Sequence, residues 1–270
     1  MIDQTADALR GQFRAAVAPG AAAGGAPDLS PLAGRLIAFE GGDGAGKSTQ
    51  LQRLAVDLRR RGLVDAPGQP RLVVTREPGG TELGQSIRSW LLDGGEVAPE
   101  AEALLYAADR AQHVAQVVRP ALDDGALVMT DRYLDSSIAY QAEGRGLAEA
   151  LVRAVNQVAT GGLTPDLTIL LDIGHQEGAE RRAASEAPAD RLERAGGGFH
   201  ARVNARYRQL AAVAAGRYAV IPARGPVEAV QRLVWLALER RLPGWSDPSA
   251  GSVESVQPGQ VAGRPRGGAK

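Results

Sequence analysis

Cysteine is absent from this 270-residue chain, and histidine is scarce. Without thiolates, the chain cannot form a disulfide scaffold, an iron–sulfur cluster or a cysteine-ligated zinc site. The three histidines, His113, His175 and His200, lie far apart in the sequence, so we do not expect a histidine-rich metal site. Long apolar runs are also missing, since no stretch approaches the ~18 residues of a membrane span.

A net charge is missing as well, because 31 basic residues balance 31 acidic ones. Such a chain is not held to nucleic acid or to an anionic membrane by bulk charge. The first residues include Asp3 and Asp7 and lack the charged-then-apolar order of a signal peptide. We therefore expect a cytoplasmic enzyme with no nucleic-acid or membrane partner.

Lysine is nearly absent, since only Lys47 and Lys270 occur and every other basic residue is arginine. A chain that uses arginine almost everywhere else has kept lysine at position 47. An ammonium is a compact charge, whereas a guanidinium is a planar fork. Lys47 is therefore a candidate functional residue.

Apolar content is adequate for a core, at 44% of the residues, but it is unevenly distributed. Residues 1–33 are rich in Ala, Gly and Pro and predict a flexible extension, with a short helix near residues 6–17. Residues 243–270 have a similar composition and predict a disordered tail. The block between them, residues 34–242, predicts a single domain.

Within this block, apolar runs alternate with amphipathic helical patterns. The runs predict strands at Leu36–Glu40, Arg71–Thr75, Ala126–Asp131, Leu167–Asp172 and Tyr218–Ile221. Such alternation indicates an α/β fold in which helices cover both faces of a parallel sheet. Ligands of such sheets bind beyond the carboxyl ends of the strands.

A glycine-rich loop follows the first expected strand. Residues 41–48, GGDGAGKS, match the P-loop pattern G-x-x-x-x-G-K-[ST] and precede a helical pattern. The glycines let backbone N–H groups face an anion, Lys47 suits the β- and γ-phosphates, and Ser48 offers a hydroxyl to Mg²⁺. The nucleotide-binding residues are expected to be Gly41, Gly42, Asp43, Gly44, Ala45, Gly46, Lys47, Ser48 and Thr49.

A P-loop alone leaves a GTPase-like switch, an ATPase motor and a small-molecule kinase open. A GTPase normally uses an Asn-Lys-x-Asp motif, which a chain with lysine only at positions 47 and 270 cannot contain. Nothing in the sequence argues for a motor. A kinase needs a second anion site with its own cations, and arginine-bearing motifs do follow the second and third expected strands, as TREPGGT and DRYLDSSIAYQ.

The ordered set EGGDGAGKSTQ, TREPGGTELG, LLYAADRAQHV, DRYLDSSIAYQ, TPDLTILLD and DRLE…FHARVNARY closely resembles the bacterial thymidylate kinases, a family of P-loop nucleoside monophosphate kinases. The resemblance covers about residues 35–240. It implies a P-loop NTPase fold with a five-stranded parallel sheet and a mobile lid. It also implies ATP as phosphoryl donor, Mg²⁺, dTMP as acceptor and a homodimer. Another P-loop kinase and a non-catalytic nucleotide-binding regulator remain as alternatives.

The resemblance also implies roles for individual residues. Asp43 would lie near the sugar and phosphate of the acceptor, and Asp131, at a strand end, would join Ser48 near the metal. Tyr106 would stack on thymine, and Tyr140 would crowd the 2′ position. The remaining acceptor-binding residues are the phosphate-holding Arg88, Arg110 and Arg132 and the base-recognising Ser137 and Gln141.

The chain departs from part of the family at Gly44, where some members place a catalytic arginine. We therefore expect a lid over about residues 177–198 to supply that arginine. Arg182 is the first candidate, with Arg181 and Arg191 behind it, and Glu193 is expected to approach the metal through water. The expected catalytic residues are then Lys47, Asp43, Arg132 and Arg182.

Overall fold

The structure is a computed structural model that describes residues 31–184, 190–192 and 194–242. Most of the expected extension over residues 1–33 lies outside the described residues, as does the whole expected tail over residues 243–270. Glu193 and part of the expected lid also lie outside them. Within the described residues, no helix has the length and apolar character needed to cross a membrane.

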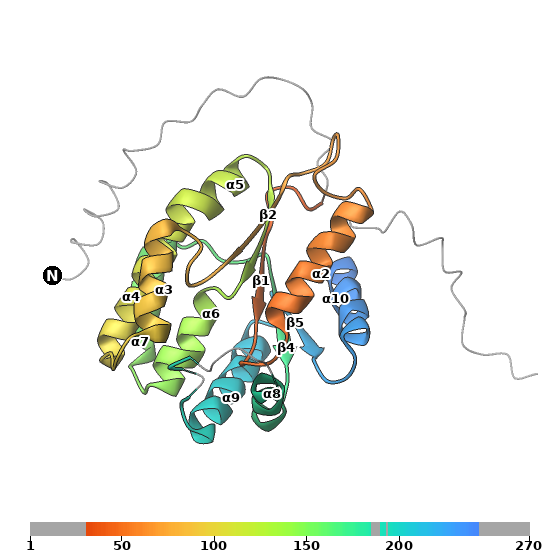
Figure 1. The fold of residues 1–270 in the computed structure, drawn as a ribbon. Helices are drawn as coiled ribbons and strands as arrows, with labels where there is room; N and C mark the ends of the chain where they lie inside the picture. Colours follow the sequence, from red (N-terminus) through yellow and green to blue (C-terminus); the bar gives the residue numbers. More distant parts are fainter. Residues whose placement is uncertain (1–30, 185–189, 193, 243–270) are drawn as a thin grey trace, which may run out of the picture.

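The described residues form a parallel five-stranded sheet in the order β2-β3-β1-β4-β5, which confirms the expected sheet (Figure 1). Three strands differ by one residue from the sequence prediction at one or both ends, because pairing with a neighbour sets where a strand starts and stops. Leu72, for example, pairs with Leu127, and Arg76 pairs with Asp131. The strands are β1 (Leu36–Glu40), β2 (Leu72–Arg76), β3 (Leu127–Asp131), β4 (Leu167–Asp172) and β5 (Tyr218–Pro222).

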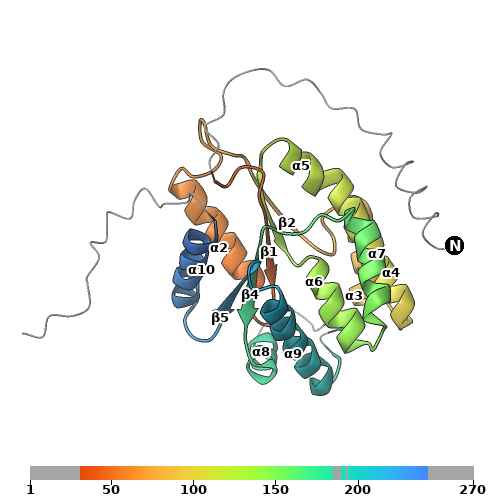
Figure 2. The ribbon, with the colours of Figure 1, turned by 180° about the vertical axis from the view of Figure 1, so that it is seen from behind.

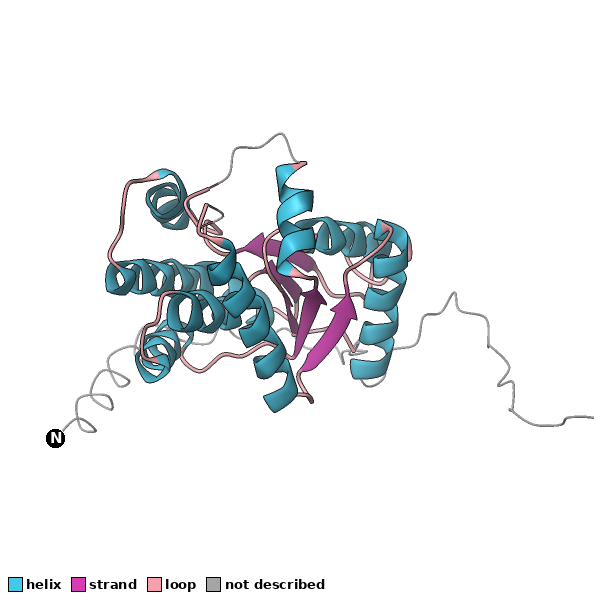
Figure 3. Cartoon of the chain, turned by 90° about the horizontal axis from the view of Figure 1, so that it is seen from below, coloured by secondary structure: helices cyan, strands magenta, loops and turns pink. Residues whose placement is uncertain are grey.

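Helices cover both faces of the sheet, as Figure 3 shows from one end of the molecule. They are α2 (Lys47–Arg60), α3 (Glu82–Asp93), α4 (Pro99–His113), α5 (Arg119–Asp123), α6 (Leu134–Ser137), α7 (Glu149–Thr160), α8 (His175–Ala183), α9 (Gly197–Val213) and α10 (Val227–Arg241), with π-helical segments η1 (Val114–Val118) and η2 (Ile138–Gly144).

Alternate residues of β1 point into different cores. Ile37 and Phe39 join the apolar cluster that packs α2 and α10 on one side of the sheet. Leu36 and Ala38 join the cluster under η1 and α5 on the other side. Figures 1 and 2 show α2 and α10 together on one side and α3, α4 and α7 on the other. The period-two alternation of a strand therefore gives the sheet its two covered faces.

The strand register brings the polar motifs to one edge. Phe39 of β1 and Arg76 of β2 both lie beside Asp131, the last residue of β3. The P-loop follows β1, TREPGGT spans the end of β2, and the DRY segment begins at the end of β3. Parallel strands end at the same edge of a sheet, so these three segments surround one region.

Candidate active site

One cavity of about 530 Å³ opens at this edge of the sheet. Its walls come from the P-loop, the β2–α3 loop, α4, the β3–α6 segment with η2, and α8. The expected site residues that line it are Asp43, Gly44, Gly46, Lys47, Ser48, Thr49, Arg88, Tyr106, Arg110, Asp131, Arg132, Ser137, Tyr140, Gln141 and Arg182. Gly41, Gly42 and Ala45 belong to the same loop but lie behind this surface.

The P-loop is shaped by glycines whose backbone φ angles are positive, including Gly44 at 76° and Gly46 at 86°. Residues with a Cβ rarely adopt this conformation, which explains the glycines. Gly46 is the N-cap of α2 and has no atom within 4 Å of where a Cβ would lie. Gly46, Lys47, Ser48 and Thr49 also line the cavity, so the N-terminus of α2 opens onto it, as an anion-binding helix terminus requires.

Lys47 lies at the start of α2 and is buried under the loop. Its Nζ donates hydrogen bonds to the carbonyl oxygens of Gly41, at 3.0 Å, and Gly42, at 2.8 Å. Burial, with the nearby Arg132 guanidinium, lowers the pKa of Lys47 from 10.5 to about 8. The Lys47 ammonium is thus fixed within the loop and poorly hydrated. An incoming phosphate would therefore displace little water from this ammonium.

Ser48 and Asp131 meet at the floor of the cavity. The Ser48 hydroxyl donates a hydrogen bond to Asp131 Oδ2. The described residues contain no cluster of three or more metal-ligating side chains. A hydroxyl and one carboxylate suit Mg²⁺, which usually takes one or two protein oxygens and fills its other positions with water and phosphate oxygens.

Arg132 lies at the centre of the polar network, in the left-handed region at φ 69°. Its Nη2 donates to Asp43 and to the Tyr140 hydroxyl, and its Nη1 donates to the Gly41 carbonyl and the Tyr207 hydroxyl. Burial alone would raise the pKa of Asp43, but Arg132 and Lys47 hold it below the ordinary value of 3.8. Asp43 therefore stays a carboxylate that orients Arg132.

Glu40 lies beneath Arg132 and was not singled out by the sequence. It accepts hydrogen bonds from the backbone N–H groups of Tyr133 and Ser136, from the Ser136 hydroxyl and from the Tyr207 hydroxyl. Burial and the neighbouring Asp135 raise the pKa of Glu40 from 4.5 to about 7. In the sequence, Glu40 could have been noticed as the acidic residue that ends the apolar run LIAFE.

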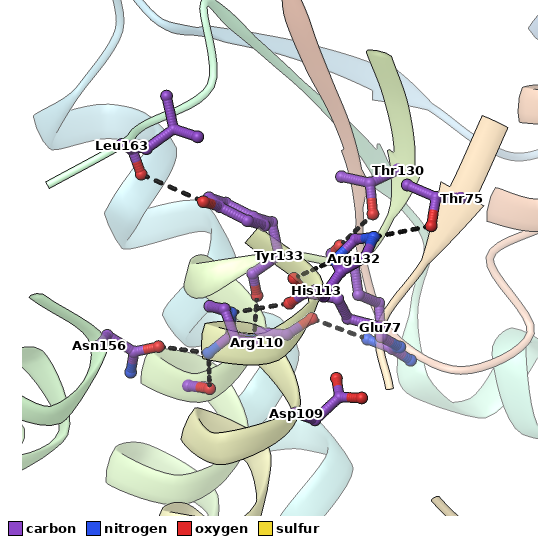
Figure 4. A network of polar contacts seen from close by, with 12 residues as sticks. Thr75, Glu77, Asp109, Arg110, His113, Thr130, Arg132, Tyr133, Asn156 and Leu163 are labelled. Atoms are coloured by element: carbon purple, nitrogen blue, oxygen red, sulfur yellow. Dashed lines mark hydrogen bonds and ion pairs between the residues drawn. The ribbon is translucent and has the colours of Figure 1, made fainter. Parts of the chain in front are cut away.

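Arg110 is almost fully buried, at 1% exposure, and is already extensively bonded (Figure 4). Its Nε donates to Glu77, its Nη1 to Ser137 and Asn156, and its Nη2 to the Tyr133 carbonyl. A guanidinium has five N–H groups, so these bonds leave one for a ligand. Arg110, which was expected to hold the acceptor phosphate, therefore has a single N–H group left for a ligand in this arrangement.

A second buried layer supports Arg110. Glu77 Oε1 lies 2.8 Å from His113 Nδ1, and His113 Nε2 lies 2.7 Å from the Thr75 hydroxyl (Figure 4). Asp109 accepts a hydrogen bond from the Gly79 backbone N–H. Hydrogen bonds thus connect the TREPGG segment to α4. The sequence alone showed that both segments are polar, but not that they contact each other.

Two further arginines face the cavity from its β2 side. Arg88 is partly buried and donates from Nη1 to the Pro78 carbonyl at 3.2 Å. Arg76, which the sequence prediction left without a role, is exposed at the end of β2 and also lines the cavity. Within the described residues, no hydrogen bond or ion pair engages the Arg76 guanidinium. In the sequence, the position of Arg76 directly after an expected strand could have identified it as a candidate site residue.

The remaining residues that were expected to bind the acceptor also line the cavity. Tyr106 projects from α4 within an apolar cluster that includes Leu92. The Tyr140 hydroxyl donates to Asp43 at 2.9 Å, and the Gln141 amide nitrogen donates to Glu102 at 3.0 Å. An aromatic ring and amide groups beside a set of cations can accommodate a planar base attached to a phosphate.

Helix α8 closes the cavity over the P-loop. A Cβ on Gly44 would lie 2.1 Å from the Gly178 carbonyl oxygen, so α8 leaves no room for a side chain at position 44. Arg181 and Arg182 both line the cavity, and Arg181 is bonded to Glu177 and to the Ala223 carbonyl. Arg191 does not line it, because this residue bonds to the Leu91 carbonyl and to Glu102.

Comparison of this sequence with those of known proteins shows which family it matches. The family model described as Thymidylate kinase matches residues 39–234. A thymidylate kinase of Thermomicrobium roseum is 49% identical over 199 residues, covering 74% of this chain and 91% of that protein. One of Nitratidesulfovibrio vulgaris is 50% identical over 204 residues, covering 73% and 88%. One of Bifidobacterium longum is 48% identical over 213 residues, covering 77% and 97%. The matched region includes every residue that lines the cavity.

Proposed function

Because the chain belongs to the thymidylate kinase family, we propose that it transfers the γ-phosphoryl group of ATP to dTMP, giving dTDP and ADP. The observation that carries this proposal is one cavity in which the P-loop faces arginines from β2, α3, α4 and the segment that follows β3. Two phosphate-bearing ligands can meet there, each with its own cations. Such phosphoryl transfer is a step toward dTTP.

The P-loop side is the proposed donor site. Residues 41–49 would surround the β- and γ-phosphates with backbone N–H groups, and Lys47 would donate to their oxygens. Ser48 and Asp131 would hold Mg²⁺ or its bound waters. The metal ion neutralises charge on the transferring phosphoryl group when it is bound.

The arginine side is the proposed acceptor site. Arg132, kept in place by Asp43, and Arg88 would neutralise the dTMP phosphate, and Arg76 joins them because it has no competing partner in the described residues. Arg110 would contribute one hydrogen bond to the acceptor. The base would stack on Tyr106 and meet Ser137 and Gln141, while Tyr140 would exclude a 2′-hydroxyl. These four residues line the same cavity.

The reaction needs no strong base, because the acceptor phosphate is already anionic at neutral pH. The barrier comes from repulsion between two polyanions and from imperfect alignment, which fixed cations and positioning lower. Arg182 of α8 lines the cavity opposite the P-loop and is the proposed lid arginine. A lid over about residues 177–198 would exclude water, so that ATP is not simply hydrolysed.

We further propose a cytoplasmic homodimer of a single kinase domain over residues 34–242, with no nucleic-acid or membrane partner. The dimer rests on the family resemblance and on exposed apolar side chains of three adjacent helices. Trp90 of α3 is 70% exposed, Leu104 of α4 is 57% exposed and Val158 of α7 is 83% exposed. Side chains of this size are costly to leave in water.

The test is an ADP-release assay in which the full chain, ATP and Mg²⁺ are supplied with dTMP, dUMP, dCMP, AMP or GMP separately. We expect dTMP to give the fastest turnover. A preferred purine acceptor, or one without a 5′-phosphate, would indicate another P-loop kinase. Nucleotide binding without turnover would indicate a regulator.

Lys47→Ala is the matched inactive variant for this assay. We expect turnover with dTMP to fall by at least ~100-fold, because the fixed ammonium would no longer offset charge on the phosphoryl group. Circular dichroism would show whether the fold is retained. Near-normal turnover in a folded variant would remove Lys47 from the proposed machinery.

A further inference from the structure

A buried carboxylate connects three segments behind the proposed base site. Glu102 lies on α4 and has no exposed surface. Its Oε1 accepts from the Gln141 amide nitrogen at 3.0 Å and from Arg145 Nε at 3.2 Å. Its Oε2 accepts from Arg145 at 3.0 Å and from Arg191 at 2.6 Å. Two guanidiniums thus compensate for burial of this charge.

The chemistry of Glu102 fixes how the Gln141 amide is turned. A carboxylate accepts hydrogen bonds but cannot donate them, whereas a glutamine amide has a donor end and an acceptor end. The NH₂ group of Gln141 must therefore face Glu102, as it does at 3.0 Å. Reversing the amide would place two oxygens against each other in a buried site, which is strongly unfavourable.

The acceptor end of Gln141 is consequently left for the ligand. Gln141 lines the cavity, and within the described residues its side-chain oxygen accepts no hydrogen bond. A fixed oxygen selects for an N–H donor on the base. Thymine and uracil carry N3–H, whereas N3 of cytosine has a lone pair and would be repelled.

From this arrangement we propose that Glu102 is a positioning residue that sets the pyrimidine preference of the acceptor site by locking the orientation of the Gln141 amide. The proposal rests on the proposed function, because it assumes that the base lies against Gln141. Glu102 does not touch the acceptor itself. Its effect is on which base is accepted.

Glu102→Gln tests this proposal, since a glutamine at position 102 can pair with Gln141 in either orientation. The values of kcat/KM for dTMP, dUMP and dCMP are measured with ATP and Mg²⁺. We expect kcat/KM for dTMP and dUMP to fall together, and the dCMP-to-dTMP ratio to rise by ~10-fold or more, the scale of one hydrogen bond lost or gained. A purely structural role would lower all three values by the same factor and would overturn the proposal.

Two variants complete the experiment. Glu102→Asp keeps an acceptor-only side chain and should retain the wild-type ratio even if overall activity drops. Glu100→Gln removes an exposed acid from the same helix and should leave all three values unchanged.

If Glu102→Gln does not fold, as judged by circular dichroism, Gln141→Ala carries the test. The dCMP-to-dTMP ratio should rise in that variant, because the selecting oxygen is gone, and an unchanged ratio overturns the proposal. Failure of the proposed function is a separate result, since it requires that the wild-type chain does not phosphorylate dTMP.

Discussion

At the scale of single residues, the site depends on charged groups held away from water. Lys47 and Glu40 are buried and Arg132 is partly buried, and each makes several hydrogen bonds. The network is cross-linked, because the Ser136 and Tyr207 hydroxyls that bond to Glu40 also accept from Arg132. A change in the charge of Glu40 should therefore alter the position of the Arg132 guanidinium.

Glu40 gives a prediction about pH and stability. Its pKa is about 7 in the folded protein against an ordinary 4.5, because burial and Asp135 disfavour the carboxylate while Arg132 only partly compensates. Between these pH values the folded state binds more protons than the unfolded state. The contribution of Glu40 to the free energy of unfolding is thus fully present below about pH 4.5 and is lost as pH rises through about 7.

The measurement is urea unfolding of the wild type and of Glu40→Gln from pH 5 to pH 8. The free-energy difference between them should shrink with rising pH, by up to ~1.4 kcal/mol per unit, and should level off above the folded pKa. Glu100→Gln serves as an exposed control and should give a curve parallel to the wild type. A difference for Glu40→Gln that does not vary with pH would contradict the assignment.

At the scale of elements, the contact between α8 and the P-loop decides what the loop can contain. Gly44 and Gly178 approach so closely that a Cβ on Gly178 would lie 2.6 Å from the Asp43 carbonyl oxygen. This contact places Arg181 and Arg182 against the cavity. The glycine at position 44, seen in the sequence as a departure from part of the family, is thus matched by a second glycine in α8.

Gly178→Ala should separate α8 from the P-loop and move Arg182 away from the phosphates. We expect kcat with dTMP to fall by ~10-fold or more, an effect of the size that small displacements of catalytic groups produce. Stability should fall, because the clash with the Asp43 carbonyl outweighs the gain of ~1 kcal/mol that alanine brings to a helix interior. Steady-state kinetics and thermal unfolding measure the two effects.

Gly216→Ala is the control, because a Cβ there meets no atom within 4 Å and the residue lies outside the proposed lid. It should keep wild-type kcat. An unchanged kcat in Gly178→Ala as well would show that the contact between α8 and the P-loop does not contribute to turnover.

At the scale of the whole molecule, three neighbouring helices each expose a large apolar side chain. Helix α4 packs against both α3 and α7, and α3 and α4 line the proposed acceptor site. Each of them has a large apolar side chain with more than half of its surface exposed: Trp90, Leu104 and Val158. If this side of the molecule is the dimer interface, association would support α3 and α4, which carry Arg88, Tyr106 and Arg110.

The homodimer predicts a mass near twice 28.1 kDa in sedimentation equilibrium. Trp90→Asp should shift the equilibrium toward the monomer, because burying a carboxylate in an apolar contact costs several kcal/mol. Val213→Asp changes a side chain that is 90% exposed on α9, away from this surface, and should keep the wild-type mass. A wild type that sediments as a monomer at micromolar concentration would contradict the dimer.

The sequence by itself determined the parallel sheet, the P-loop and the family, because these depend on local patterns. Apolar runs, helical periodicity and GGDGAGKS are each contained in a short stretch of chain. The expected strands accordingly differ from the observed ones by no more than a residue at each end.

Only the tertiary structure decided how individual side chains are used. Pairing between distant segments engaged four of the five N–H groups of the Arg110 guanidinium, buried Glu40 and Glu102 as hydrogen-bond acceptors, and bonded Arg191 to groups outside the cavity. Each result depends on partners tens of residues away in the chain, such as Glu102 with Gln141. The sequence shows that a side chain is charged, but the fold determines which groups already neutralise it and which are left for a ligand.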